Sequence, residues 1–360
     1  MKIVKVPSFA DTICDLRVRK IKNVFLSQID VLIDWRKISN IINKYYTKGN
    51  SAVGNPSYDG LLLFKMSLLQ TWYGLSDYEV EERINDSISF SKFCGLTLEQ
   101  ASPDHSTLSR FRSRMTENNA YEKLLKEFNR QLEKHQIIVK TGAIIDASVV
   151  DTPLKPKGKS SYEIAQDRHE DERTEEDLEK EKKEKESLKT LKPSVDSDAS
   201  WIKKAGKLRY GYKKHHVTDE NGLVLGVLTT SANVNEISNL EEVLATADLP
   251  EGAVIYGDKG YQSIKNEKIL REKKFKSRIL KKAKKNQPLS EIEKKFNKLC
   301  GKIRYKVERT FGSIKRWFNG GTARYKGISK MHSQNMLEAL AYNLYRSPAL
   351  IALNAIKNEK

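Results

Sequence analysis

The sequence predicts two unlike parts, an all-α N-terminal region and an α/β domain with a mixed sheet flanked by helices. Apolar residues recur at helical spacing through the first part. After it, apolar strands, one hairpin and helices alternate along the chain, which is typical of an α/β domain. We place the helical region at residues 1–136. The α/β domain then spans residues 137–350, with a charged insert at about residues 156–200.

The helical region contains one segment of particular interest. Residues 58–75, YDGLLLFKMSLLQTWYGL, have apolar positions at helical spacing. Residues 102–115, SPDHSTLSRFRSRM, predict a turn in which Asp104 or Ser106 caps a short basic helix. Either DNA contact or a solvated helix face would explain its three arginines, which are Arg110, Arg112 and Arg114.

The α/β domain is predicted from its order of elements. Residues 137–150 are an apolar strand with Asp146 near its end, and residues 207–219 and 223–233 form a hairpin that turns near Gly222. The remaining elements are a helix at 237–247, a strand at 253–258, a helix at 266–274, a strand at 277–280, and helices at 291–318 and 332–346.

A charged stretch interrupts this order between the first two strands. Residues 167–186, DRHEDERTEEDLEKEKKEKE, hold almost no apolar side chains and therefore have no means of building a core. A solvated helix and a disordered insert both fit this composition.

Charge and composition limit the partners and the location. The formal net charge of +18 favours a polyanionic partner, with nucleic acid as the first choice. Three cysteines lie far apart without a pairing pattern, which favours reduced thiols in a cytoplasmic protein. The sequence contains no run of about 18 apolar residues, which is the length that would predict a membrane span. We expect a cytoplasmic protein without a membrane partner.

Three acids are the candidate metal ligands. Asp146 and Asp258 each end an apolar strand, so neighbouring strands would bring both to one edge of the sheet. Converging carboxylates repel unless they bind a cation, and oxygen ligands favour Mg²⁺ or Mn²⁺. Each acid alone is also explained by a strand-end cap or a salt bridge. Glu308, on a helix face shared with Arg304 and Lys315, is the third acid, although Arg304 and Glu308 also have the spacing of an ordinary helix ion pair.

These motifs together resemble the DDE transposases of bacterial insertion sequences, in the superfamily often called IS-four/IS-five. The stretches that carry the resemblance in the second half are IIDASVVDTP, RYGYKKHHVTDENGLVLGVLTTSANVNE, VIYGDKGY and VERTFGSIKRWFNGGTARYKG. In the first half, PSYDGLLLFKMSLLQTWYGLSDYEVEERINDSISFSKFCGL and SPDHSTLSRFR resemble the N-terminal domain of the same family. The resemblance spans roughly residues 55–346.

The resemblance implies a ribonuclease-H-like catalytic domain and a metal-binding triad of Asp146, Asp258 and Glu308. The family pattern around the glutamate is Tyr, two residues, Arg, three residues, Glu, six residues and Lys. Arg304, Glu308 and Lys315 match it, whereas Gly301 stands at the Tyr position. The implied cofactor is Mg²⁺ or Mn²⁺, as two ions about 3.5–4 Å apart.

The implied reaction is metal-dependent cleavage at the ends of the insertion sequence and joining of the 3′-OH to target DNA. The implied partners are double-stranded DNA, both transposon ends and target, and a second copy of the chain. A nuclease that cuts without joining, and a DNA-binding protein without activity, are the two competing interpretations.

Further DNA contacts are expected on this basis. The candidates beyond the basic helix are Lys213, His215, Lys259, Lys281, Lys282, Arg304 and Trp317. The alternatives are strand-surface residues for Lys213 and His215, and a local charge partner of Asp258 for Lys259. For Trp317 the alternative is a core position. Lys281 and Lys282 belong to a basic run at residues 273–285, and the alternative for this run is a solvated edge.

Overall fold

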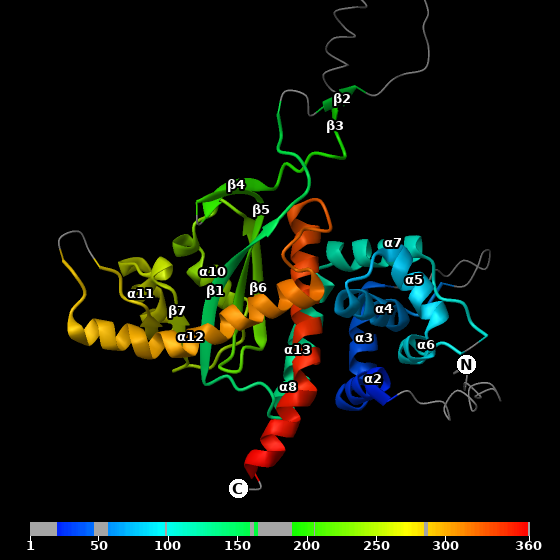
Figure 1. Ribbon diagram of the computed structural model, residues 1–360, viewed down its shortest axis with the longest axis horizontal. Coiled ribbons are helices and arrows are strands. Elements are labelled where there is room, and N and C mark those ends of the chain that lie inside the picture. Colours follow the sequence, from blue (N-terminus) through cyan, green and yellow to red (C-terminus); the bar gives the residue numbers. More distant parts are fainter. Residues whose placement is uncertain are drawn as a thin grey trace, which may run out of the picture.

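The structure is a computed structural model that describes residues 20–46, 57–97, 99–158, 162–164, 189–204, 206–283 and 287–358. It confirms the predicted fold class, since a group of helices precedes a mixed sheet flanked by helices (Figure 1). In the described ranges, no helix is both long enough and apolar enough to cross a membrane.

The N-terminal helices surround one central helix. They are α2 (Lys20–Leu32), α3 (Trp35–Tyr45), α4 (Gly60–Tyr73), α5 (Asp77–Asp86), α6 (Ile88–Cys94), α7 (His105–Glu117) and α8 (Ala120–Lys134). Helix α4 is buried along almost its whole length because apolar residues occupy most of its circumference. The Asp59 carboxylate accepts a hydrogen bond at its start, and Gly74 ends it in the left-handed region at φ 65°.

The sheet has six strands, which are β1 (Gly142–Asp151), β4 (Ser200–Lys204), β5 (Lys207–Thr218), β6 (Val224–Ser231), β7 (Val254–Gly257) and β8 (Lys276–Ile279). Their order is β4–β5–β1–β7–β8, and β6 also pairs with β5. Strand β1 pairs antiparallel with β5 and parallel with β7, which pairs parallel with β8. This mixed sheet fits the ribonuclease-H-like fold that the resemblance implied.

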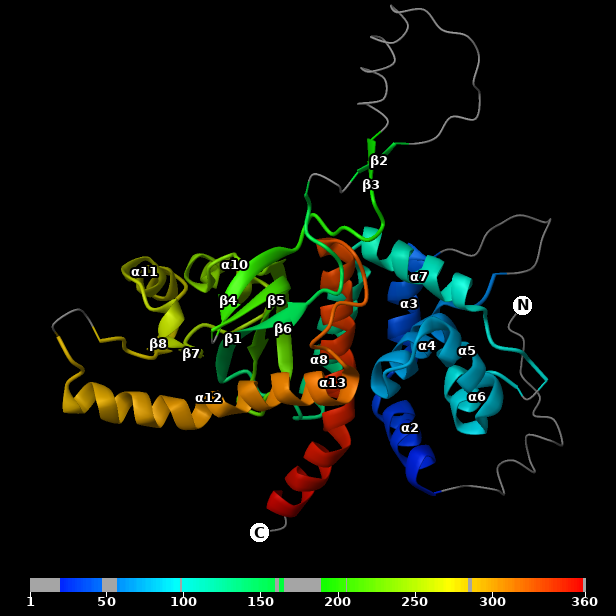
Figure 2. The same cartoon turned by 45° about the horizontal axis from the view of Figure 1, so that its top comes forward.

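The remaining helices pack around the sheet. They are α10 (Leu240–Ala245), α11 (Ile264–Glu272), α12 (Glu291–Phe318) and α13 (Ile328–Asn358). Figure 2 shows α12 running beside the sheet towards α13. Helix α13 lies between the sheet and the N-terminal helices, and it contacts β6 as well as α4 and α8 (Figure 1).

Hydrogen bonds to α13 join the two parts of the chain. The indole Nε1 of Trp72 donates to the carbonyl of Ala341 at 2.8 Å. The amide of Asn343 donates to the carbonyl of Val224 at 2.8 Å and to Oδ1 of Asn129 at 2.9 Å. One hydrophobic core runs from the helical region through α13 to the sheet, so the two predicted parts share their interior.

The second half of the expected insert differs from the prediction. The Asp196 carboxylate is buried and accepts a hydrogen bond from the hydroxyl of Tyr212 at 2.6 Å. Val195 and Ala199 are also buried, and Ser200 begins β4. These few buried residues connect residues 195–200 to the sheet. In the sequence they are isolated and close to a long charged run, so the local pattern does not predict their burial. The run 167–186 lies outside the described residues, while β2 (Tyr162–Ile164) and β3 (Lys189–Leu191) pair beside it.

A buried ion pair fastens β5 to α13. The Lys214 ammonium lies 2.8 Å from Oε2 of Glu338 and donates to the carbonyl of Gly320 at 2.7 Å. The side chains of Lys214 and Glu338 are 0% and 4% exposed. Gln334 donates to the other carboxylate oxygen of Glu338 at 2.8 Å, so the pair has partners on both sides.

Removing one member of this pair is expected to destabilise the fold strongly. Glu338→Ala leaves the Lys214 charge buried without its counter-ion, and we expect the free energy of unfolding to fall by about 3–5 kcal/mol. The matched control is Glu251→Ala, which breaks the exposed pair between Glu251 and Lys274 and should cost less than about 1 kcal/mol. Urea unfolding of both variants measures the difference, and equal losses would contradict this role of the buried pair.

Candidate active site

Two neighbouring strands bring Asp146 and Asp258 together. Strands β1 and β7 pair in parallel, and their last pair is Ile145 with Gly257. Asp146 directly follows Ile145, and Asp258 directly follows Gly257. The condition for the two acids to meet, that their strands are neighbours, is therefore fulfilled. The predicted strand end at Asp146 is wrong, because β1 continues to Asp151 through its pairing with β5.

The chain leaves the sheet directly after β7. Asp258 caps the short 3-10 helix η2 (Lys259–Tyr261), where its Oδ1 accepts a hydrogen bond from the backbone N–H of Lys259 at 2.7 Å. A side chain at Gly257 would meet Ile145 at 3.2 Å, so the glycine allows the close approach of β1 and β7. The turn directs the Asp258 carboxylate to the region where the β1–β7 pairing stops.

Helix α12 brings the third acid. It begins with a capping box in which Ser290 and Glu293 exchange hydrogen bonds. Further along, Val307 and Phe311 are buried against Ile144 of β1, with Tyr256 of β7 packed beside them. This apolar contact fixes the rotation of α12, so the helix face with Arg304 and Glu308 is directed at the two aspartates.

The guanidinium of Arg304 lies among the three carboxylates. Its Nη2 is 3.0 Å from Oδ2 of Asp146 and 3.3 Å from Oε1 of Glu308. Its Nη1 is 3.5 Å from Oδ1 of Asp258. The ordinary helix pair between Arg304 and Glu308 is thus present, and it forms part of a larger cluster. Burial works against the charged form of Arg304, but Asp146 and Asp258 outweigh it and raise the pKa of the guanidinium.

The cluster has the donor chemistry of a divalent-cation site, although Arg304 lies inside it. Three carboxylates offer the hard oxygen ligands that Mg²⁺ and Mn²⁺ prefer. As they are arranged around the guanidinium, no three His, Cys, Asp or Glu residues in the described part of the chain form a group that could hold a metal ion. In this arrangement the guanidinium of Arg304 is the cation that the three acids share.

Lys315 lies two helical turns beyond Glu308 on α12 and is half-buried. Burial, followed by the positive charges of Lys214, Arg209 and Lys204, lowers its pKa to about 8. Its ammonium is therefore repelled by cations already in place, and an added negative charge would relieve that repulsion.

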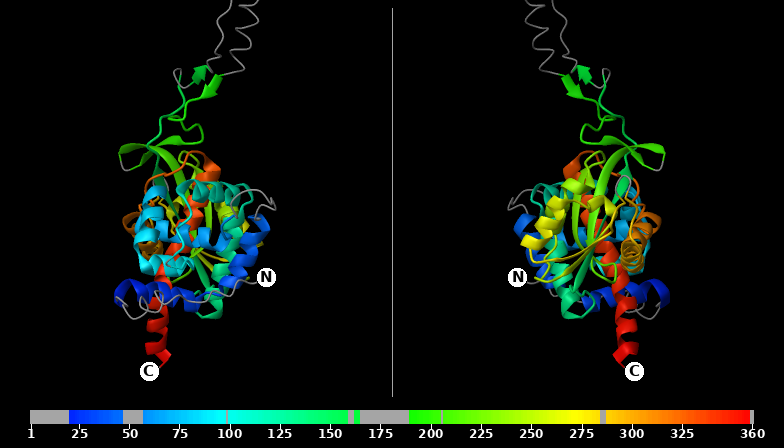
Figure 3. Two further views of the ribbon diagram at one scale, coloured as in Figure 1. Left: turned by 90° about the vertical axis from the view of Figure 1, so that its right-hand side faces the viewer. Right: turned by 90° about the vertical axis from the view of Figure 1, so that its left-hand side faces the viewer.

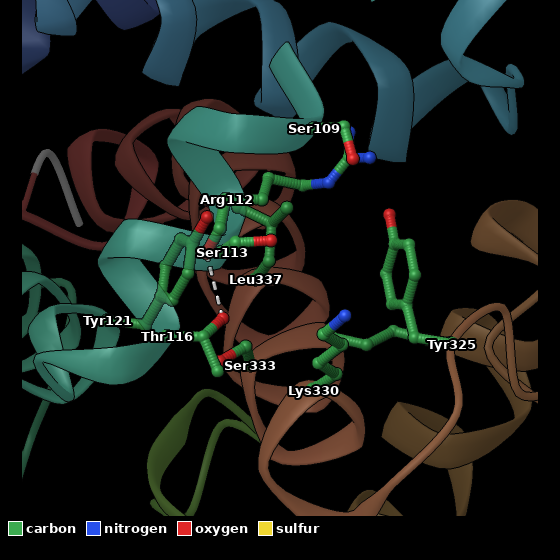
Figure 4. Close-up of a pocket in the computed structure, with 10 residues that line it drawn as sticks. Ser109, Arg112, Ser113, Thr116, Tyr121, Tyr325, Lys330, Ser333 and Leu337 are labelled. Atoms are coloured by element: carbon green, nitrogen blue, oxygen red, sulfur yellow. Dashed lines mark hydrogen bonds between the residues drawn. The ribbon is translucent and has the colours of Figure 1, made fainter. Parts of the chain in front are cut away.

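The three arginines of α7 have different surroundings. Arg110 and Arg114 are exposed, whereas Arg112 is buried. Arg112 lies 2.5 Å from the carboxylate of Asp77 and donates to Gln70 at 3.1 Å. Figure 4 shows Arg112 lining a small cavity of about 50 Å³ between α7, α8 and α13. Because its guanidinium has internal partners, we remove Arg112 from the expected DNA contacts.

Lys213 and His215 are also internal. The Lys213 ammonium donates to the carbonyl of Val234 at 2.8 Å and lies 3.5 Å from Glu236. His215 is fully buried, and burial together with the charge of Lys213 lowers its pKa to about 3. It is therefore neutral at pH 7, and neither side chain faces solvent. We leave both out of the proposed DNA contacts because β5 lies inside the sheet.

The other candidates lie at or near the surface. Lys259 and Lys282 are exposed. Lys281 is partly buried and lies 3.7 Å from Glu267. Lys281 and Lys282 line an open groove of about 870 Å³ along α11. Trp317 is 41% exposed, which excludes the alternative of a core position, and its ring centroid lies 5.1 Å from that of Tyr345.

Comparison with known families covers both parts of the chain. The model of the transposase DDE domain matches residues 137–344, more than half of the chain and all of the candidate site. The chain belongs to the DDE transposases. A transposase domain of the type DUF772 matches residues 15–114, in the helical region. The predicted family is confirmed, and the chain is an enzyme of the class that acts on DNA.

One sequence relative agrees with this family. The transposase for insertion sequence element IS1106 of Neisseria meningitidis serogroup B is 32% identical over 240 residues, 66% of this chain and 76% of the relative. Among solved structures, a piggyBac transposase synaptic complex with hairpin DNA gives a TM-score of 0.45 at 10% identity, covering 94% of this chain and 78% of that one. A Mos1 transposase paired-end complex gives 0.21 at 11% identity, covering 84% and 81%.

The Arg304 cluster predicts a measurable coupling between Arg304 and the acids. Arg304→Gln should lower the free energy of unfolding by about 1–3 kcal/mol, because the partly buried Asp146 and Asp258 and the exposed Glu308 lose their shared cation. Asp146→Asn in the same chain should recover part of this loss. A double-mutant cycle on urea unfolding should give a coupling of about 1 kcal/mol or more between the two residues.

The control for this cycle is Lys302→Gln, an exposed residue on the same helix. Its coupling to Asp146 should be within about 0.5 kcal/mol of zero. Equal coupling energies for Arg304 and Lys302 would mean that Arg304 does not act as the shared counter-ion.

Proposed function

We propose that this DDE transposase binds the terminal inverted repeats of its insertion sequence, cleaves the DNA strand at each end and joins the 3′-OH to target DNA. Asp146, Asp258 and Glu308 are the proposed catalytic and metal-binding residues. The observation that carries this proposal is the convergence of the three acids on the guanidinium of Arg304, since each comes from a different element of the fold.

The proposed cofactor is Mg²⁺ or Mn²⁺, as two ions held by the three carboxylates. When bound, such ions lower the pKa of an attacking water or 3′-OH and stabilise the leaving oxygen. The chain itself holds the acids on the sheet and on a long helix, which limits how far they must move when DNA and metal bind. Arg304 and Lys315 supply positive charge for a DNA phosphate beside the acids.

The proposed DNA contacts are the candidates that lie at or near the surface. Lys259 directly follows Asp258, and Lys281 and Lys282 line the groove along α11. Arg110 and Arg114 offer a second exposed pair on α7. Trp317 presents an aromatic ring suited to stacking on a base. Because two transposon ends must be joined in one event, we propose a homodimer on DNA.

Two competing functions make different predictions. A nuclease would cut the ends without joining them, and a strand-transfer assay with unlabelled target DNA separates it from a transposase. A DNA-binding protein without activity would bind the ends and leave them intact. The presence of all three acids in contact with Arg304 favours an enzyme over this last function.

The acid cluster is tested by cleavage of labelled DNA that carries the element's own ends. Asp258→Asn should reduce cleavage in Mg²⁺ or Mn²⁺ by at least about 100-fold, because the neutral amide weakens metal binding. DNA affinity without metal should change little. The control is Asp248→Asn, which changes an aspartate that is 92% exposed and lies outside the cluster.

Three outcomes of this experiment are decisive. Loss of cleavage in Asp258→Asn alone would support the triad. Equal cleavage by the wild type and Asp258→Asn would remove Asp258 from the chemistry. DNA binding without cleavage by any of the three proteins would favour the inactive DNA-binding function.

Lys315 predicts a dependence of DNA affinity on pH. Its lowered pKa of about 8 means that the free protein loses this charge between pH 7 and pH 9. Binding to phosphate favours the charged form, so affinity should fall as pH rises, by up to about tenfold over this range. Lys315→Arg keeps its charge and should show a smaller decrease. Fluorescence anisotropy at both pH values measures this, and identical pH profiles would exclude a contact by Lys315.

A further inference from the structure

The β4–β5 hairpin extends beyond the rest of the sheet. Strand β1 pairs with β5 only as far as Gly211, and β6 pairs with β5 only as far as Tyr212. Beyond these residues, β5 continues to Lys207 with β4 as its paired strand. The result is a two-stranded ribbon at the end of the sheet (Figure 3).

The ribbon has an unusual composition for an edge. Residues 200–210, SWIKKAGKLRY, contain four basic residues and no acid. Lysines on an edge strand are a common protection against pairing with other strands. Protection alone does not explain the large apolar side chains beside them, since Trp201 is 49% exposed and Leu208 is 64% exposed.

The register assigns these side chains to two faces. Directly opposite residues of an antiparallel pair lie on the same face. Trp201 pairs with Tyr210 and Lys203 with Leu208, which gives one mostly apolar face. The other face holds Ile202, Lys204, Lys207 and Arg209.

The basic face is anchored to β1, the strand that carries Asp146. Arg209 makes a two-point ion pair with Asp151 of β1, at 2.7 Å and 2.5 Å. Lys204 and Arg209 are also among the charges that act on Lys315 of α12. The backbone N–H of Asp151 also donates to the carbonyl of Gly321, so the base of the ribbon lies near the C-terminal end of α12.

The distance along the strands fits a contact with the same DNA duplex. The backbone N–H of Thr152 donates to the carbonyl of Tyr210, which places Trp201 level with Thr152. Thr152 is six residues beyond Asp146, or about 20 Å at the rise of a strand. Lys204 and Lys207 lie three residues further, at about 30 Å. At about 3.4 Å per base pair, these distances correspond to roughly six to nine base pairs.

We propose that the β4–β5 ribbon is a DNA-binding element that enters the major groove of the transposon end, about six to nine base pairs from the cleaved bond. The major groove admits a two-stranded β-ribbon. Lys204 and Lys207 contact phosphates, while Trp201 and Leu208 make apolar contacts in the groove. This inference rests on the proposed function, because it assumes that DNA lies across the acid cluster.

The test uses the full chain and a duplex that carries the element's own end. The first variant, Lys204→Gln with Lys207→Gln, should lose about two phosphate contacts. Its salt slope, log K against log salt, should fall by about two, and its affinity at 0.1 M salt should fall by about 60-fold. Trp201→Ala should weaken binding with an unchanged salt slope, because the lost side chain carries no charge. In hydroxyl-radical footprints, both variants should lose protection six to nine base pairs from the cleavage site.

The matched control is Lys126→Gln with Lys134→Gln, which removes two exposed lysines from α8. Its affinity and footprint should equal those of the wild type. Thermal unfolding should show that all the variants are folded. If the ribbon variants bind and protect DNA as the control does, while the wild type still cleaves the ends, the ribbon inference is wrong and the proposed function stands.

Two other outcomes are also informative. A wild type that neither binds nor cleaves the ends would overturn the proposed function and the ribbon inference together. A ribbon variant with unchanged DNA binding but an altered molecular mass in solution would show that the ribbon contacts a second copy of the chain.

Discussion

The contact of Arg304 with Asp146, Asp258 and Glu308 is the interaction on which the catalytic half of this structure depends. Three carboxylates at the meeting point of two strands and a helix repel one another, and burial increases that repulsion. A single guanidinium has enough N–H groups to serve all three. Its position on α12 therefore allows the helix to pack against β1 and β7 without leaving the acids unpaired.

The packing around α12 makes this arrangement rigid. Val307 and Phe311 fix the helix against the sheet on the side of the acids. Further along, Ile314 and Phe318 enter the core that continues into the helical region. Helix α13 closes the structure through the buried pair of Lys214 and Glu338. The N-terminal helices thus support the site indirectly, because they share a core with the two helices that hold it.

Local pattern in the sequence was sufficient to predict the parts of the site that depend on it. The apolar strand before Asp258 and the long helix of Glu308 are visible in short windows, and both are present. The internal positions of Arg112 and Lys214 depend on distant residues instead. Asp77 is 35 residues from Arg112, and Glu338 is 124 residues from Lys214.

The error at Asp146 has the same origin. An acid within an apolar run suggests a strand end, yet β1 continues because β5 provides hydrogen bonds as far as Gly211. The polar residues of β5 led to a different error, in which buried side chains were expected at the surface. Lys213 and His215 suggest a surface strand, but both are buried, and the segment after β6 contacts Lys213 through Val234 and Glu236. Burial on a sheet is decided by the neighbours of a strand, which a single strand sequence does not reveal.

Charge balance indicates what Arg304 does when the proposed reaction takes place. As the cluster stands, three negative carboxylates face one positive guanidinium, so negative charge remains in excess. Two divalent ions would bring four positive charges, and the three acids with one DNA phosphate would match them. Such a site is neutral only without the guanidinium. A fifth positive charge inside it would also oppose metal binding. In the proposed complex, the phosphates on either side of the cleaved bond would offer Arg304 new negative partners. On this argument one residue holds the acids together before DNA and metal bind, and binds DNA afterwards.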